Sequence, residues 1–210
     1  MLKLVAFDCD GVLFDSREAN IAFYNAILAK FNRPPMDPER VDYVHSRTFR
    51  ESLEYLFGAG DHLAEVLAFC RTLSYQPFIP MMVEAPYLRD FLTFLRPRFF
   101  TAVATNRTTT THPVLSFHGL DKYFDLVVSA LDVTHPKPHP ESFWRILRHF
   151  RVEPEEAIYI GDSHVDEEFA HNAGVALVAY RNPNLKAAYY LESFAQGPAL
   201  IQSLTGVKSG

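Results

Sequence analysis

The sequence predicts an α/β protein, built on a Rossmann-like parallel sheet with helices on both faces. Three observations predict this fold class. Short apolar runs rich in strand-forming residues recur along the chain, amphipathic helical patterns separate them, and most of the runs are apolar on both faces. The chain has 210 residues, 48% of them hydrophobic and 21% charged, so it is able to bury a full core.

Five apolar runs are expected to form the strands, and amphipathic segments between them predict the covering helices. The expected strands are Leu2–Phe7, Phe99–Ala104, Leu126–Ser129, Ala157–Ile160 and Val175–Tyr180. The expected helices are Arg17–Phe31, Tyr87–Leu95 and Pro140–Phe150. We therefore expect five or six parallel strands, and surface helices in the last thirty residues, from Arg181 onward.

The strand pattern disappears between Ser16 and roughly Val83, where Phe49–Phe57 and His62–Leu73 have helical periodicity. This predicts an inserted all-α cap over residues 16–84, within a core domain made of residues 1–15 and 85–210. The Pro-marked stretch Gln76–Pro86 is the expected hinge. Such a cap is expected to close over the site and exclude water.

Composition argues against several classes of partner. A formal charge of -5 gives no field that would gather nucleic acid. The only two cysteines lack metal-type spacing, which favours a reducing, cytoplasmic compartment. An acidic residue at position 8 interrupts any signal-peptide apolar region, and the longest uncharged apolar stretch, Thr72–Val83, is shorter than the roughly 20 residues of a bilayer span. We expect no membrane partner, and a monomer or homodimer.

Polar residues follow three of the expected strands at the point where each strand ends. The first run ends in Asp8-Cys9-Asp10-Gly11, the second in Thr105-Asn106, and the fourth in Gly161-Asp162, with Asp166 close behind. Open parallel sheets place ligands beyond the carboxyl ends of their strands, so these side chains are expected to meet at one edge. Alternation along an extended segment puts Asp8 and Asp10 on the same side.

Crowded carboxylates repel one another unless a cation offsets their charge. Oxygen ligands with room for water and phosphate suit Mg²⁺, and Lys137, held between prolines in residues 134–140, is a candidate for a second positive charge. A carboxylate to attack, another to move protons, a metal, a lysine and the hydroxyl of Thr105 together make a phosphoryl-transfer site.

Four segments resemble the ordered motifs of the haloacid dehalogenase superfamily. They are DCDGVLFDS at 8–16, ATNRT at 104–108, PKPHP at 136–140 and GDSHVD at 161–166. The resemblance spans the whole core. The subgroup that the chain most resembles has a helical cap after the first motif, as in phosphoglycolate phosphatases and β-phosphoglucomutases.

The resemblance implies a role for each matching residue. Asp8 would form an aspartyl-phosphate, and Asp10 would protonate the leaving oxygen and then activate water. Thr105 and Lys137 would hold the phosphoryl group. Magnesium would be bound by the carboxylates of Asp8 and Asp162 and the backbone carbonyl of Asp10, with Asp166 steadying Lys137 or a metal-bound water.

Substrate contacts are assigned to Gly11, Asn106, Arg47 and Arg107. Arg47 and Arg50 lie in HSRTFRESLEYLF, which resembles the cap segment where this subgroup reads its substrate, and arginine suits a second phosphate or carboxylate. A solvated helix face is an equal alternative for both, and Arg107 has the same two interpretations. The histidines at positions 45, 135, 139, 164 and 171 lack the paired spacing of a zinc site, and none is assigned to catalysis.

The predicted activity is magnesium-dependent hydrolysis of the phosphate monoester of a small metabolite. A sugar phosphomutase on the same fold and cleavage of another bond, such as pyrophosphate, remain open. A phospho-receiver module also uses acidic residues, a Thr and a Lys, but the order of the motifs and the long helical insertion argue against it. A catalytically silent binding protein is disfavoured because no chemical group of the site is missing.

Overall fold

The computed structural model describes residues 1–45, 47 and 49–206; the side chain of His45 lies outside the described part. The chain forms two compact units. One consists of Met1–Asp15 and Glu84–Gly210, and the other of Ser16–Val83. Among the described residues, no helix combines the length and the apolar character that crossing a membrane requires.

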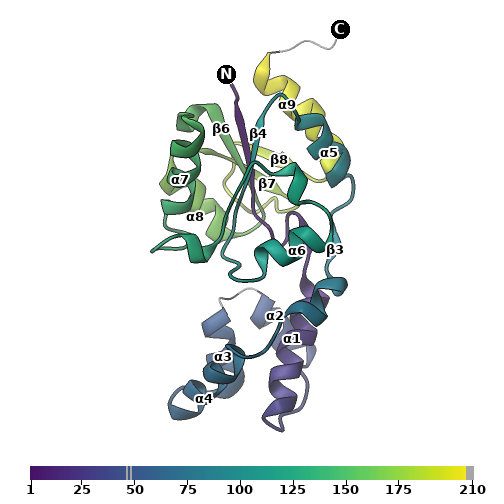
Figure 1. Cartoon of the computed structure of the whole chain (residues 1–210), viewed down its shortest axis with the longest axis vertical. Helices are drawn as coiled ribbons and strands as arrows, with labels where there is room; N and C mark the ends of the chain where they lie inside the picture. Colours follow the sequence, from purple (N-terminus) through teal and green to yellow (C-terminus); the bar gives the residue numbers. More distant parts are fainter. Residues whose placement is uncertain (46, 48, 207–210) are drawn as a thin grey trace. The chain divides into compact units, whose positions relative to one another are not determined.

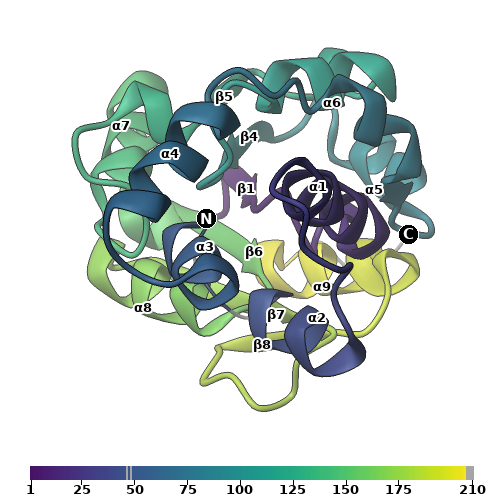
Figure 2. The same ribbon diagram turned by 90° about the horizontal axis from the view of Figure 1, so that it is seen from below.

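The first unit is built on a parallel sheet that has six strands within the described residues. In spatial order these are β5 (Leu126–Val128), β4 (Phe100–Ala104), β1 (Leu4–Phe7), β6 (Ala157–Gly161), β7 (Ala176–Tyr180) and β8 (Tyr189–Leu191). Figure 2 shows this succession of strands. The predicted fold class is confirmed.

Helices cover both faces of the sheet. Helices α7 and α8 lie on one face and α5 and α9 on the other (Figure 1). The helices of this unit are α5 (Leu88–Leu95), α6 (Thr111–Phe117), α7 (Glu141–Phe150), α8 (His164–Ala173) and α9 (Gly197–Thr205), and short 3-10 helices lie at Asp121–Tyr123, Ala130–Asp132, Pro154–Glu156 and Phe194–Gln196.

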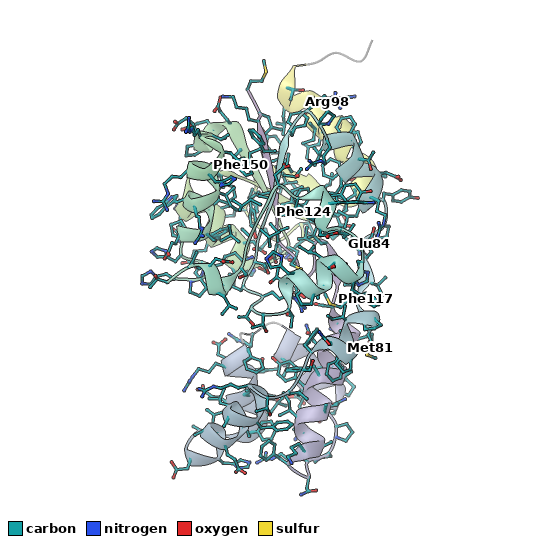
Figure 3. The ribbon with its side chains drawn as sticks, viewed as in Figure 1. Met81, Glu84, Arg98, Phe117, Phe124 and Phe150 are labelled. Atoms are coloured by element: carbon teal, nitrogen blue, oxygen red, sulfur yellow. The ribbon has the colours of Figure 1, made fainter. Side chains whose placement is uncertain are left out.

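The central strands are buried on both faces, which explains their continuous apolar runs. All four residues of β1 and all five of β6 are buried. Helix α7 buries Phe143, Ile146 and Leu147, which share one face because they are three or four positions apart. On the opposite side of the sheet, the rings of Phe7 and Phe124 meet edge to face, and Figure 3 labels Phe124 in the interior.

The five strands expected from the apolar runs form, with ends shifted by at most two residues. The expectation of helices alone after Arg181 is wrong, because Tyr189–Leu191 is the sixth strand; α9 does form. This three-residue strand is too short for a periodic signal. Its pairing with β7 and the hydrogen bond from Ala188 N to Leu177 O make it a strand.

In the second unit, the secondary-structure elements described before Val83 are all helices, joined by loops. It contains α1 (Arg17–Lys30), α2 (Pro38–His45), α3 (Phe49–Phe57), α4 (Asp61–Cys70) and the 3-10 helix η1 (Gln76–Met81). Its own apolar core includes Ile27, Leu53 and Val66, with Phe57 and Phe31 meeting edge to face. Two short strands, β2 (Phe14–Asp15) and β3 (Val83–Glu84), form a separate two-stranded sheet.

Candidate active site

The topology of the sheet brings three strand ends to one edge. Strand β1 pairs in parallel with β4 on one side and β6 on the other. The residues that follow these strands, Asp8, Thr105 and Asp162, therefore lie at the carboxyl edge of the sheet. The backbone N–H of Asp8 still donates to Ile160 O at 2.9 Å, and that of Thr105 to Val128 O at 3.1 Å, so both residues are held by the ladder itself.

Lys137 is a buried cation at the centre of this edge. Its Nζ lies 2.8 Å from Asp8 Oδ1, 2.8 Å from the hydroxyl of Tyr159 and 2.7 Å from Asp166 Oδ1. An ammonium group has three N–H donors, and all three have partners here. Lys137 therefore acts in this arrangement as a fixed charge that holds Asp8, and it would have to exchange a partner to bind a phosphoryl oxygen directly.

Asp166 is fully buried and is held on both of its carboxylate oxygens. While Oδ1 accepts from Lys137, Oδ2 accepts from the hydroxyl of Ser163 at 2.6 Å, from Ser163 N at 3.1 Å and from Asp162 N at 3.2 Å. A Cβ at Gly161 would lie only 2.4 Å from the Cβ of Asp166, so glycine is required for this close approach. Asp166 thus positions Lys137 and the loop after β6.

Asp162 offers oxygen atoms that suit a hard cation. Its carboxylate groups with those of Asp8 and Asp166, with ligand atoms all within 4.8 Å of one another. Among the described residues, its Oδ1 is buried without a hydrogen-bond partner, and a buried acceptor of this kind needs an explanation such as an ion. Gly11, at φ +80°, makes room for it, because a Cβ there would lie 2.1 Å from Asp162 Oδ2. The donor set fits Mg²⁺.

With its carboxylates ionised, the site has more negative than positive charge. Burial raises the pKa of Asp8 to about 7 although Lys137 lowers it, and burial followed by the charge of Asp8 raises the pKa of Asp162 to about 8. Burial opposes the charged forms of Asp166 and Lys137 too, but their attraction keeps the pKa of Asp166 below its usual value and that of Lys137 above it. When the three carboxylates of Asp8, Asp162 and Asp166 are all ionised they share one lysine, which leaves a deficit of positive charge.

Arg107 binds Asp10 with a planar, two-point contact. Its Nη2 donates to Asp10 Oδ1 at 2.6 Å and its Nε to Oδ2 at 3.0 Å. The arginine side chain is 7% exposed and that of Asp10 is 36% exposed. Hydrogen bonds also hold the loop at residues 105–110 in place. Arg107 N donates to the hydroxyl of Thr105 at 3.1 Å, and Arg107 Nη1 donates to the hydroxyl of Thr110 at 3.0 Å.

The other predicted substrate residues have different surroundings. Asn106 is occupied by the backbone of Lys137: its Nδ2 donates to Lys137 O and its Oδ1 accepts from Lys137 N, both at 2.9 Å. Arg47, in the helical unit, is exposed at a bend, with its guanidinium 5.4 Å from the centre of the Tyr43 ring. Arg50 pairs with Glu54 at 3.0 Å along a helix.

Three residues of the site lie outside the predicted set. The Tyr159 hydroxyl contacts Lys137, Asp166 and the carbonyl of Ala104. Ser163 caps α8 and holds Asp166, while Asn182 Nδ2 donates to Asp162 O at 2.7 Å. A Ser three residues before an Asp is a capping signal that the sequence does carry. For Tyr159, the only signal in the sequence is a tyrosine inside the apolar run before Gly161-Asp162. No sequence signal points to Asn182.

Comparison with known proteins adds the family. The family model of the haloacid dehalogenase-like hydrolases matches residues 5–180, which include each of the four motifs. The chain belongs to this family. The resemblance inferred from the motifs is therefore confirmed, and the chain is a hydrolase of the haloacid dehalogenase (HAD) type with phosphatase-named relatives.

Similar proteins cover almost the whole HAD hydrolase chain. The pyrophosphatase PpaX of Oceanobacillus iheyensis is 30% identical over 216 residues, covering 92% of this chain and 89% of PpaX. A crystal structure of a HAD-superfamily hydrolase of subfamily IA from Geobacter sulfurreducens PCA is 39% identical with a TM-score of 0.83, covering 97% of this chain and 96% of its own. A chain assigned as a phosphoglycolate phosphatase from Lactobacillus plantarum shares the fold at 21% identity, with a TM-score of 0.82 and coverage of 97% and 99%.

Proposed function

We propose that this HAD hydrolase is a magnesium-dependent phosphatase that hydrolyses a small phosphate monoester through an aspartyl-phosphate on Asp8. The observation that carries the proposal is the burial of Asp8 and its contacts. Its carboxylate is almost completely buried, held by Lys137 at 2.8 Å, and grouped at the carboxyl edge of the sheet with that of Asp162, whose buried Oδ1 has no hydrogen-bond partner among the described residues. A desolvated, oriented carboxylate beside a cation is suited to attack phosphorus.

The proposed reaction has two steps. In the first, a carboxylate oxygen of Asp8 forms a bond to phosphorus while the ester P–O bond breaks, and Asp10, which would have to exchange one of its Arg107 contacts for a proton, gives that proton to the leaving oxygen. In the second, Asp10 takes a proton from water, the water oxygen bonds to phosphorus, and the Asp8–phosphorus bond breaks. Lys137 keeps Asp8 oriented throughout, and Thr105 donates a hydrogen bond to the phosphoryl oxygens.

Magnesium would be held by the carboxylates of Asp8 and Asp162 and by the backbone carbonyl of Asp10. The deficit of positive charge and the buried Asp162 Oδ1 support this choice of ligands. When bound, the ion supplies positive charge that offsets the phosphoryl oxygens. Asp166 is left out of the ligand set because Lys137, Tyr159, Ser163 and the backbone already occupy both of its oxygens.

Arginines are the proposed readers of the substrate. Arg107 would orient Asp10 and add positive charge beside the leaving group. Arg47, exposed at the bend before α3, is proposed to bind an anionic group of the substrate, with the helical unit serving as the cap. Gly11 donates its backbone N–H to Phe14 O at 2.8 Å, so it would act by leaving room for the carboxylate of Asp162, whereas Asn106 would act by holding the backbone of Lys137.

Pyrophosphate is the second candidate substrate. The relative that is 30% identical over most of the chain is named a pyrophosphatase. The same two steps would apply, with phosphate as the leaving group. Arg107, which lies against Asp10, would add positive charge near such an anionic leaving group.

The test is phosphate release from phosphoglycolate, sugar phosphates, an aryl phosphate and pyrophosphate, with Mg²⁺ or with a chelator. We expect release only with Mg²⁺, and the rates rank the substrates. Asp8→Asn should abolish release and leave the fold intact, whereas Asp121→Asn, an exposed carboxylate in the same unit, should match the wild type. Mass spectrometry confirms that the asparagine is retained. An active Asp8→Asn protein would overturn the mechanism, and a stable phosphoenzyme without release would favour the phosphomutase.

A further inference from the structure

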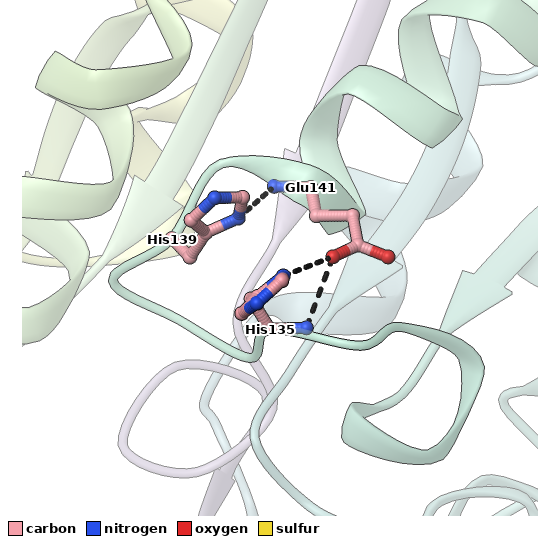
Figure 4. A group of neighbouring side chains, drawn as sticks. All are labelled: His135, His139 and Glu141. Atoms are coloured by element: carbon pink, nitrogen blue, oxygen red, sulfur yellow. Dashed lines mark hydrogen bonds and ion pairs between the residues drawn. The ribbon is translucent and has the colours of Figure 1, made fainter.

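Two exposed imidazoles flank Lys137 in the loop before α7, and a carboxylate from the first residue of that helix lies beside them (Figure 4). His135, His139 and Glu141 offer ligand atoms that all lie within 4.8 Å of one another. His135 Nδ1 is 3.1 Å from Glu141 Oε2, and the two imidazole rings are 4.7 Å apart between centres. The sequence pattern gave no reason to expect a zinc-type group here, so the folded loop is what assembles it.

These separations are close to those around a small metal ion. Ligands at about 2.0–2.1 Å from a tetrahedral ion are about 3.3 Å from one another. The His135–Glu141 pair already has this spacing. His139 Nδ1 accepts the N–H of Glu141 at 3.3 Å, a long hydrogen bond that an ion at the same nitrogen would replace. Both histidines are exposed, so a small rotation of either ring meets little resistance.

The backbone of the loop is fixed before any ion binds. Glu141 Oε1 accepts from Thr134 N and Oε2 from His135 N, both at 2.9 Å. In the middle of the loop, Asn106 holds the backbone of Lys137 through two further hydrogen bonds. Because the scaffold of the two histidines is already ordered, ion binding would immobilise only side chains.

The chemistry of the donors selects the ion. Imidazole nitrogens suit Zn²⁺, Ni²⁺ and Cu²⁺, whereas Mg²⁺ prefers an octahedral shell of oxygens. An ordinary ion pair between His135 and Glu141 accounts for one contact, but it is solvent-exposed and contributes little to stability. His139 approaches the same pair through its long hydrogen bond from Glu141 N.

We propose that His135, His139 and Glu141 form a second cation site, specific for borderline transition ions of the Zn²⁺ class. It is a different site from the carboxylate group of Asp8 and Asp162. A fourth position remains for water or another ligand. Since the site spans the loop that carries Lys137, an ion there would tie the two ends of this loop together.

The only tryptophan of the sequence makes the site observable. Trp144 lies on α7, is 45% exposed, and its ring centre is 5.9 Å from that of His139. A paramagnetic ion such as Ni²⁺ quenches indole fluorescence at this range, whereas Zn²⁺ does not. The readout requires no substrate and no turnover, so its outcome is independent of the proposed phosphatase activity.

The experiment titrates the metal-stripped full chain with NiCl₂ in excess Mg²⁺ and follows tryptophan fluorescence. We expect saturable quenching with one equivalent of Ni²⁺, reversed by ZnCl₂. The variant His135→Ala/His139→Ala should bind at least about tenfold more weakly, which is about 1.4 kcal/mol. His149→Ala, an exposed histidine on the same helix outside the group, should match the wild type.

Two results would overturn the proposal. One is an equal midpoint in the double variant, which would indicate coordination elsewhere on the surface. The other is quenching that rises linearly without saturation. Circular dichroism of both variants verifies that they are folded, and Glu141 is left intact because its carboxylate also holds the backbone of the loop.

Discussion

Arg107 holds Asp10 by both carboxylate oxygens, at 2.6 Å and 3.0 Å, from a position where the arginine itself is almost fully buried. A planar guanidinium fixes the plane of the carboxylate as well as its distance, which a lysine is unable to do. The contact with Arg107 therefore fixes the orientation of Asp10, the proposed general acid and base.

Arg107→Lys should therefore lower kcat. We expect a loss of about tenfold to a hundredfold, since misplacement of a reacting group by about 1 Å has an effect of that order. Steady-state kinetics on the best substrate of the panel measures it, with the exposed Arg98→Lys as the control. A normal kcat with a raised KM would instead assign Arg107 to substrate binding alone.

Tyr159→Phe tests the hydrogen bond that holds the ammonium group of Lys137. Removing the hydroxyl leaves Lys137 and Asp166 each short of one buried hydrogen bond, at a cost of about 1–3 kcal/mol in the free energy of unfolding. We expect a lower melting temperature and reduced kcat. Tyr180→Phe is the matched control, because this buried tyrosine stacks on Phe194 and should leave kcat unchanged. Equal losses of kcat in both variants would contradict a specific role for Tyr159.

Gly11→Ala should weaken activation by Mg²⁺ through a steric effect. The new Cβ would overlap the carboxylate of Asp162, and that carboxylate would have to move. We expect the Mg²⁺ concentration for half-maximal activity to rise at least about tenfold, or about 1.4 kcal/mol. Gly119→Ala places the same residue at φ +62° with nothing within 4 Å, so it controls for backbone strain alone. The same Mg²⁺ dependence in Gly11→Ala and the wild type would argue against Asp162 as a ligand.

The stability of the metal-free protein should fall as the pH rises. The pKa values of Asp8 and Asp162, about 7 and about 8, lie above the ordinary 3.8, so the folded chain binds these protons more tightly than the unfolded chain does. Their contribution is complete below the unfolded pKa and is lost as the pH rises through 7 to 8. Magnesium prefers the ionised carboxylates, so it should raise the melting temperature more at about pH 8 than at about pH 6.

Thermal unfolding in chelator and in Mg²⁺ across this pH range measures both effects. Asp162→Asn removes one titrating group and one proposed ligand, so its Mg²⁺-dependent shift should be smaller than that of the wild type. A magnesium shift that is independent of pH would contradict the linkage.

Local patterns predicted much of the fold and the position of the site. The apolar runs mark buried parallel strands, and because such strands share one carboxyl edge, the residues after them had to converge. What local patterns do not contain is pairing between distant segments. Tyr159 hydrogen-bonds to Lys137, 22 positions away in the sequence, and Asn106 hydrogen-bonds to the backbone of Lys137, 31 positions away. Strand β8 forms because it pairs with β7. The position of Arg107 follows the motif, but its contact with Asp10, 97 residues away, depends on the tertiary fold.

The chain leaves the sheet-containing unit and returns to it at two neighbouring points. Leu13 O accepts a hydrogen bond from Ala85 N at 3.0 Å, on either side of the inserted residues 16–83. The two segments that flank the insertion are thus hydrogen-bonded to each other within the sheet-containing unit. The inserted residues do not separate them. Chain ends this close tolerate exchange of whatever is spliced between them. The inserted residues and the residues at the sheet edge can then change in sequence independently of each other.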